Sequence, residues 1–195
     1  YIGANDGKGM HHLLTEIIAN AMDEAAAGYG KEITVNINTT TNMASVVDNG
    51  RGIPFKRNKE GKWAIVEMCT NLHSGGKFTG QGNYKSSLGL NGVGATVTNA
   101  LSTFFEITSI REGEQCVFTV KNGVFADPTI KPIKTNISGS TVSFIPDASV
   151  FGALKWDIPT IKEELQLHAL LNNGIRFNLT ITDDDKIIEK TSYYY

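Results

Sequence analysis

The chain has 195 residues, of which 41% are hydrophobic and 19% charged, and its formal net charge at pH 7 is −2. This length and composition predict one globular domain with a real core, and the weak net charge gives no sign of a strongly basic nucleic-acid-binding surface. No apolar run approaches the length of a membrane span. The two cysteines, Cys69 and Cys116, have no metal-binding spacing, and we interpret them as buried small hydrophobic residues.

Residues 10–27 are predicted to form one amphipathic helix. At about 100° per residue, apolar side chains fall on one side, and Glu16, Asn20, Asp23 and Glu24 fall together on the other. An acidic helix face is usually a solvated surface. Here, however, nothing basic lies four residues away to form ordinary exposed pairs. We therefore predict that the rest of the chain forms walls around this polar face.

The next segments predict two strands, a short helix and a long glycine-rich loop. Apolar and polar residues alternate over 32–38, and a second strand is predicted at 44–48. A short helix is expected over 63–72. Residues 74–94 show little apolar periodicity and are long for a structureless loop, which is typical of a functional lid or a disordered segment. A further helix is predicted over 93–101.

The C-terminal half predicts hairpins and one long helix over 158–171. The expected strands are 104–111, 115–121, 130–134, 141–145, 175–182 and 186–193. No internal repeat or linker-like tract divides the chain, so 1–195 is interpreted as one domain. The order of elements predicts an α+β two-layer sandwich, with helices on one face of a mostly antiparallel, mixed sheet.

Two glycine stretches stand out. Residues 48–54 end the second predicted strand, and their two glycines permit a close backbone approach that a Cβ would forbid. Such a stretch is equally well a simple tight turn, but an Asp at its head could accept a hydrogen bond from an exocyclic amine. Residues 89–94 precede a helix, where backbone N–H groups can bind phosphate. Neither a Walker A loop nor a Rossmann fingerprint is present, so any nucleotide is held by another scheme.

The order of these features resembles the ATPase domain of the B subunit of bacterial DNA gyrase and its topoisomerase IV counterpart, in the GHKL (Bergerat-fold) superfamily. The resemblance covers essentially the whole chain. The segments that carry it are 1–3, 16–25, 48–54, 72–78 and 84–102. It implies the Bergerat ATP-binding fold, with ATP and Mg²⁺ as cofactors.

The resemblance also implies roles for individual residues. Glu16 matches the general base that deprotonates the attacking water, and Asn20 matches the Mg²⁺ ligand. Asp48 matches the acceptor of the adenine amino group, with Ser140 supporting it through water. Ser140 departs from the threonine that is common in the family.

Further positions match residues around the nucleotide. Arg51 matches the residue that pairs with Glu24 and stacks under the adenine edge. Arg111 is a candidate contact at the pocket mouth for competitive, aminocoumarin-type inhibitors. The remaining implied nucleotide contacts are Gly52, Ile53, Pro54, Lys77, Tyr84, Gly89, Leu90, Asn91, Gly92, Val93, Gly94 and Ala95. Asn91 stands where bacterial relatives usually have His, so a titratable imidazole is lost there.

By this resemblance the chain is expected to be the N-terminal ATP-binding domain of a cytoplasmic type II topoisomerase subunit. Its N-terminal arm and transducer domain are expected to lie outside 1–195, so the isolated domain should turn over weakly. Implied partners are a second copy, the DNA-cleaving A/ParC-type subunit and duplex DNA, with no membrane. Alternatives are a nucleotide-gated dimerisation module, a chaperone or mismatch-repair ATPase, and a histidine kinase. Glu16 argues against the last.

Overall fold

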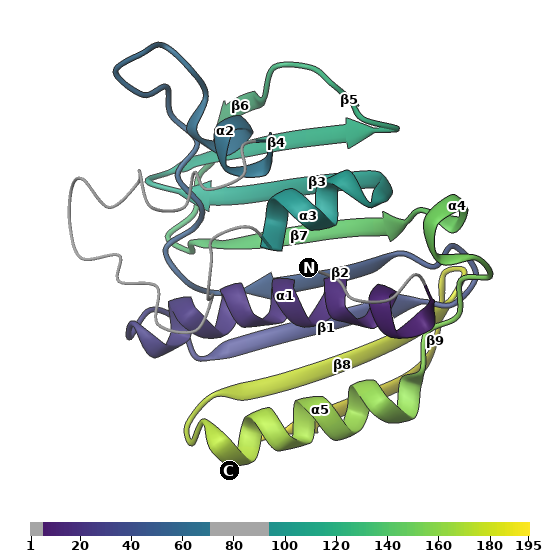
Figure 1. The fold of residues 1–195 in the computed structure, drawn as a ribbon. Coiled ribbons are helices and arrows are strands. Elements are labelled where there is room, and N and C mark those ends of the chain that lie inside the picture. The colour runs from purple at the N-terminus through teal and green to yellow at the C-terminus, as the bar shows by residue number, and fades with distance from the viewer. Residues whose placement is uncertain (1–5, 71–93) are drawn as a thin grey trace.

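The computed structural model describes residues 6–70 and 94–195 (Figure 1). The helices are α1 (Gly7–Ala26), α2 (Ala64–Thr70), α3 (Gly94–Ala100), α4 (Ala148–Phe151) and α5 (Ile158–Leu171). The strands are β1 (Glu32–Asn38), β2 (Ala44–Asp48), β3 (Ser102–Arg111), β4 (Glu114–Lys121), β5 (Val124–Phe125), β6 (Thr129–Pro132), β7 (Gly139–Pro146), β8 (Arg176–Asp183) and β9 (Lys186–Tyr193).

One nine-stranded sheet has the order β5-β4-β3-β7-β2-β1-β8-β9, and β6 pairs with β4. Among the described strands, β1 and β8 form the parallel pair and the other pairs are antiparallel. Helices α1, α3 and α5 lie against one face of the sheet (Figure 1). The predicted α+β sandwich with a mostly antiparallel, mixed sheet is therefore confirmed.

The core lies between this helical layer and the sheet. On β1, Ile33, Val35 and Ile37 alternate inward and are at most 1% exposed, whereas the intervening Thr34 and Asn36 lie half-buried on the opposite face. Period-two alternation of this kind makes one sheet face apolar and leaves the other polar. The apolar side of α1 packs onto the buried face, which turns its polar side away from the core.

Helix α1 begins at Gly7, earlier than the predicted Met10. The Asp6 carboxylate caps it by accepting hydrogen bonds from the N–H groups of Lys8 at 2.9 Å and Gly9 at 3.4 Å. Such a cap satisfies N–H groups that have no partner within the helix. The predicted start was late because apolar periodicity begins only after this capped turn.

The remaining predictions match the structure within a few residues, with two omissions. Strands β1 and β2 have the predicted bounds, as does α5, whereas β5 and α4 were not predicted. Cys69 and Cys116 are buried free thiols, which confirms their interpretation. The predicted loop and helix start at 74–93 lie outside the described residues. None of the described helices is both long and apolar enough to cross a membrane.

Candidate functional site

The polar face of α1 forms one wall of the candidate site. The Glu16 side chain is 20% exposed, and His12, one turn earlier, places Nε2 at 3.4 Å from Glu16 Oε1. The first residue of α3, Gly94, lies so close that a Cβ there would be 2.7 Å from Glu16 Oε2. Asn20 lies one turn further along α1 and is exposed. This face thus presents a carboxylate held between His12 and the start of α3, next to an accessible amide.

Asp48 ends β2 and faces Ser140 on the neighbouring strand β7. The Ser140 hydroxyl donates directly to Asp48 Oδ2, and the Gly50 N–H donates to Oδ1 at 2.9 Å. Burial raises the pKa of the Asp48 carboxyl, and the charge of Glu24 adds to this, whereas the hydrogen bonds from Ser140 and Gly50 oppose it. The site therefore holds a mostly buried carboxylate whose charge is poorly solvated.

Arg51 is locked onto the C-terminal part of α1. Its Nε and one terminal nitrogen donate to the two oxygens of Glu24 at 2.8 and 3.0 Å, and its backbone N–H donates to Oε1 at 2.8 Å. The Glu24 side chain is 11% exposed, so this bidentate pair is largely shielded from water. The carboxylate thereby ties the turn after β2 to α1.

The turn from Asp48 to Pro54 rests on the ends of β3 and β7. Gly52 has φ +77°, and a Cβ there would lie 2.4 Å from the Ile110 carbonyl oxygen, so only glycine fits this contact. Side chains hold three carbonyl groups of the turn. Ser138 Oγ donates to Gly50 at 2.6 Å, Ser109 Oγ to Ile53 at 2.8 Å and an Arg111 terminal nitrogen to Gly52 at 3.3 Å.

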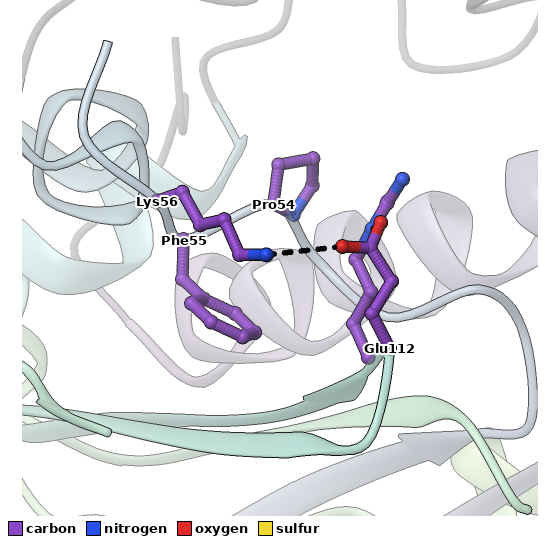
Figure 2. Close-up of a pocket in the computed structure, with 5 residues that line it drawn as sticks. Pro54, Phe55, Lys56 and Glu112 are labelled. Carbon is purple, nitrogen blue, oxygen red and sulfur yellow. Dashed lines mark hydrogen bonds and ion pairs between the residues drawn. The ribbon is translucent and has the colours of Figure 1, made fainter. Parts of the chain in front are cut away.

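A pocket of about 180 Å³ opens beside this turn and is lined by Pro54, Phe55, Lys56, Arg111 and Glu112 (Figure 2). At the mouth of this pocket Glu112 forms ion pairs with two cations, and Lys56 Nζ and Arg111 Nε each lie 3.2 Å from its carboxylate. These two cations lower the pKa of the Glu112 carboxyl. The pairs are exposed, so each contributes little to stability.

The structure brings most of the predicted residues within the described ranges to one place. The α1 face carries Glu16, Asn20 and Glu24, and the turn beside it carries Asp48 and Arg51. Predicted residues outside the described ranges are Lys77, Tyr84, Gly89, Leu90, Asn91, Gly92 and Val93. Within the described ranges, sequence reasoning missed His12, although its spacing of four residues from Glu16 on one helix was a usable signal.

The serines that hold the turn, Ser109 and Ser138, were also missed. They lie 56 and 88 residues away in the chain from the carbonyl groups they hold. No local pattern reports such contacts, because they depend on the pairing and placement of distant strands.

The donor set suits a magnesium ion that is bound mainly by phosphate. Within residues 6–70 and 94–195, no group of three or more His, Cys, Asp or Glu side chains could hold a metal ion. Magnesium usually takes only one or two protein oxygens and keeps phosphate and water ligands. The exposed amide of Asn20, one turn from Glu16, fits that requirement without a protein cage.

A buried acceptor at a strand end, beside a helix that carries a carboxylate and an amide, suits the binding of a nucleotide whose base is held at the acceptor and whose phosphates lie along the helix. Residues 5–126 match the family described as histidine kinase-, DNA gyrase B- and HSP90-like ATPases. The chain belongs to this family.

Similar proteins carry a more particular name, as each is the B subunit of a DNA topoisomerase 4. The Enterococcus faecalis protein is 40% identical over 196 residues, which cover 100% of this chain and 28% of that protein. The Mycoplasma capricolum protein is 42% identical over 190 residues, or 97% of this chain and 29% of that protein. The Streptococcus pneumoniae protein is 40% identical over 198 residues, or 100% and 30%. The chain thus spans less than a third of the length of the curated relatives it matches.

Proposed function

We propose that this chain is the ATP-binding and hydrolysing domain of a bacterial type II DNA topoisomerase, of the kind found in the B subunit of topoisomerase IV. The observation that carries the proposal is the buried Asp48 carboxylate, held by Ser140 and Gly50 beside the Glu24–Arg51 pair. The relatives named as B subunits of topoisomerase 4 support the particular enzyme.

Asp48 supplies the specificity for the base. An ionised carboxylate accepts hydrogen bonds only, so it suits the exocyclic amino group of adenine. The shielded surroundings of Asp48 strengthen such a bond and penalise any base that leaves the carboxylate unpaired. Arg51, Ile53 and Pro54 form the neighbouring wall.

Glu16 is the proposed general base. A carboxylate on a rigid helix can orient the attacking water and accept its proton, and hydrolysis of a phosphoanhydride needs little further covalent help. His12 at 3.4 Å restrains the carboxylate on one side and Gly94 on the other. Magnesium, held through Asn20, would supply charge neutralisation at the phosphates. Lys77, Tyr84 and residues 89–95 complete the phosphate side in this proposal.

In the longer protein, ATP-driven association of two copies would be coupled to DNA strand passage, with the DNA-cleaving A/ParC-type subunit as partner. The proposed location is the cytoplasm. Competitive inhibitors would occupy the adenine site and extend to the mouth formed by Pro54 and Arg111.

The test is calorimetric titration of the chain with a non-hydrolysable ATP analogue and Mg²⁺. We expect one bound nucleotide, and Asp48→Asn should weaken binding at least about tenfold because a charge-assisted hydrogen bond is lost. Asp127→Asn, an exposed carboxylate outside the site, is the matched control and should bind like the parent. Unchanged affinity in Asp48→Asn would remove the base-binding role, and a parent that binds nothing would remove the proposal.

The topoisomerase part needs the longer protein. Together with its A/ParC-type partner it should decatenate DNA with ATP, whereas its Glu16→Ala variant should not sustain turnover. If the intact protein hydrolyses ATP but never passes DNA strands, the chain is instead another ATPase of the same family.

A further inference from the structure

Tyr29 is the third residue after the end of α1, and its ring covers the guanidinium group of Arg51. The Arg51 Cζ is 3.6 Å from the centroid of the Tyr29 ring. Gly28 and Gly30, at φ +91° and +78°, bracket Tyr29 in backbone conformations that favour glycine. The Tyr29 N–H donates to the Glu24 carbonyl oxygen at 3.1 Å. The end of α1 is therefore shaped to place this ring beside the turn.

Glu24 and Tyr29 restrain Arg51 in complementary ways. Glu24 binds two nitrogens along one edge of the guanidinium, which fixes that edge in position. An edge contact alone still permits the plane to tilt about the line that joins the two groups. The Tyr29 ring, stacked on one face, removes this tilt through cation–π attraction and van der Waals contact.

A role in stability alone explains this arrangement poorly. Tyr29 is 44% exposed and belongs neither to the hydrophobic core nor to the partly buried residues packed against it. Arg51 lies in the turn that begins at Asp48, the proposed base acceptor, and its side chain is only 23% exposed. A Cβ on Gly50 would lie 2.3 Å from Glu24 Cγ and 2.9 Å from Asp48 Oδ1, so the Glu24 side chain that holds the guanidinium lies close to Asp48.

We propose that Tyr29 is a positioning residue for adenine recognition: it sets the plane of Arg51 and thereby the fit of the base against Asp48. The inference rests on the proposed function and adds a residue to it. Tyr29 acts through Arg51, so it should affect nucleotide affinity and leave the chemical step at Glu16 unchanged.

The experiment measures the affinity for a non-hydrolysable ATP analogue in a double-mutant cycle of Tyr29→Leu and Arg51→Leu. Tyr29→Leu should weaken binding about five- to tenfold, and Tyr29→Phe should stay within about twofold of the parent, since a phenyl ring keeps the stack. In the Arg51→Leu background, Tyr29→Leu should cause no further loss. In the full-length enzyme, Tyr29→Leu should raise KM and leave kcat unchanged.

Tyr194 offers a matched control, because Arg176 Cζ lies 4.5 Å from its ring centroid in a similar stack between the start of β8 and the residue after β9. Tyr194→Leu should bind the analogue like the parent. Thermal unfolding of every variant separates local from global effects, and an affinity loss that follows the melting temperature in both Tyr29→Leu and Tyr194→Leu would overturn the inference.

Further outcomes distinguish the two proposals. If Asp48→Asn loses affinity and Tyr29→Leu does not, the inference is wrong and the proposed function stands. Additive losses in the double variant would also overturn it, since Tyr29 would then act independently of Arg51. If the parent binds no analogue, both proposals fail together.

Discussion

At the scale of single residues, the charge of Asp48 has opposite expected effects on the stability of the fold and on the binding of nucleotide. Its carboxyl pKa is raised above the ordinary value of 3.8, mainly by burial. A group whose pKa is raised in the folded state contributes its stability fully below the unfolded pKa, and this contribution is lost as the pH rises through the folded pKa. At neutral pH the ionised form of Asp48 therefore lowers the stability of the fold, whereas in the proposed function the same charge binds the ligand.

This conflict predicts that Asp48→Asn has a free energy of unfolding equal to or above that of the parent at pH 7, while it binds adenine nucleotides poorly. Asn keeps an acceptor for the Gly50 N–H, and its amide can donate to Ser140 Oγ, whose hydroxyl hydrogen can rotate away. Urea unfolding at pH 4 and pH 7 measures this. The free energy of unfolding of the variant should increase relative to that of the parent as the pH rises. A difference that stayed constant with pH would contradict a raised pKa of Asp48.

Glu16 predicts the opposite separation, of chemistry from binding. Glu16→Ala should lower the ATPase rate of the full-length enzyme by about 10²- to 10⁴-fold, the usual contribution of a general base. The affinity for nucleotide should stay within about twofold of the parent, because the proposed contact that holds the adenine is made by Asp48 on the adjoining turn and not by Glu16. Steady-state kinetics beside titration of the same variant measures both. If Glu16→Ala still hydrolysed ATP at the rate of the parent, the general base would be another residue.

At the scale of elements, the contact between α1 and α3 positions Glu16, the proposed general base. A Cβ on Gly94 would lie 2.7 Å from Glu16 Oε2 and 3.1 Å from Glu16 Cβ. Gly94→Ala should therefore displace Glu16 and lower kcat at least about tenfold, since misplacing a reacting group by about 1 Å can cost 10²-fold. The fold should persist, as alanine favours helices. Circular dichroism beside kinetics measures both, and an unchanged kcat would contradict this packing.

Helices α1 and α5 meet through a histidine that is held neutral. His11 Nε2 accepts a hydrogen bond from the Asp157 N–H at 2.9 Å, next to Trp156. Burial lowers the His11 pKa below its ordinary value of 6.5, against the charges of Asp157 and Glu164. The unfolded chain binds this proton more readily, so the stability that neutral His11 contributes is lost as the pH falls below about 6.5.

The resulting prediction is a fall in unfolding free energy between pH 7 and pH 5.5 that is smaller in His11→Gln. Glutamine cannot titrate but still offers an oxygen to the Asp157 N–H. Urea unfolding of both proteins at the two pH values measures the difference. Since the two proteins differ only at residue 11, the comparison isolates His11. Parallel pH profiles would show that His11 does not supply the dependence.

The elements also show why sequence reasoning succeeds in some places and fails in others. The bounds of strands β1 and β2 were predicted correctly because their apolar residues alternate with polar ones, and this alternation identifies the buried face of each strand. Strand β5 consists of two residues, both exposed, and α4 consists of four residues, so neither is long enough to show a hydrophobic period. In the same way, helical periodicity brought Glu16, Asn20 and Glu24 onto one face.

The rest of the site depends on contacts between distant segments. Ser140 reaches Asp48 only because β7 pairs with β2 in one particular register. Tyr29 was overlooked because its partner Arg51 follows a whole strand pair later, and a tyrosine at a helix end has no local signature of stacking. Resemblance to a family was enough to predict Ser140, whereas the contact of Tyr29 with Arg51 is seen only in the structure.

At the scale of the whole molecule, the site is a junction rather than a property of one element. Its residues come from α1, the turn after β2, the ends of β3 and β7, and the start of α3, all joined through one sheet and one core. Helix α4 lies at the end of the sheet opposite the loop that follows β2 (Figure 1). A ligand at the junction therefore restrains elements whose other ends lie far from it.

We accordingly predict that an adenine nucleotide stabilises the described domain as one cooperative unit. At a free ligand concentration of a hundred times Kd, the free energy of unfolding should rise by about 2.7 kcal/mol. Trp156, which packs edge-on against Phe144 and His11, reports on a region away from Asp48. The Trp63→Phe variant keeps Trp156 as its one tryptophan. With nucleotide bound, the urea unfolding midpoints of this variant measured by Trp156 fluorescence and by far-ultraviolet circular dichroism should rise together.

Asp48→Asn is the control: at the same ligand concentration, binding weakened about tenfold should reduce the stabilisation in both signals to about 1.4 kcal/mol or less. If circular dichroism moved and Trp156 did not, the nucleotide would stabilise only a local part of the sheet. The site would then be a separable surface feature, and the coupling through α1 and the shared core would be wrong. Coincident shifts would instead show that binding energy at the turn after β2 is distributed through the packed layer of helices to the far end of the sheet.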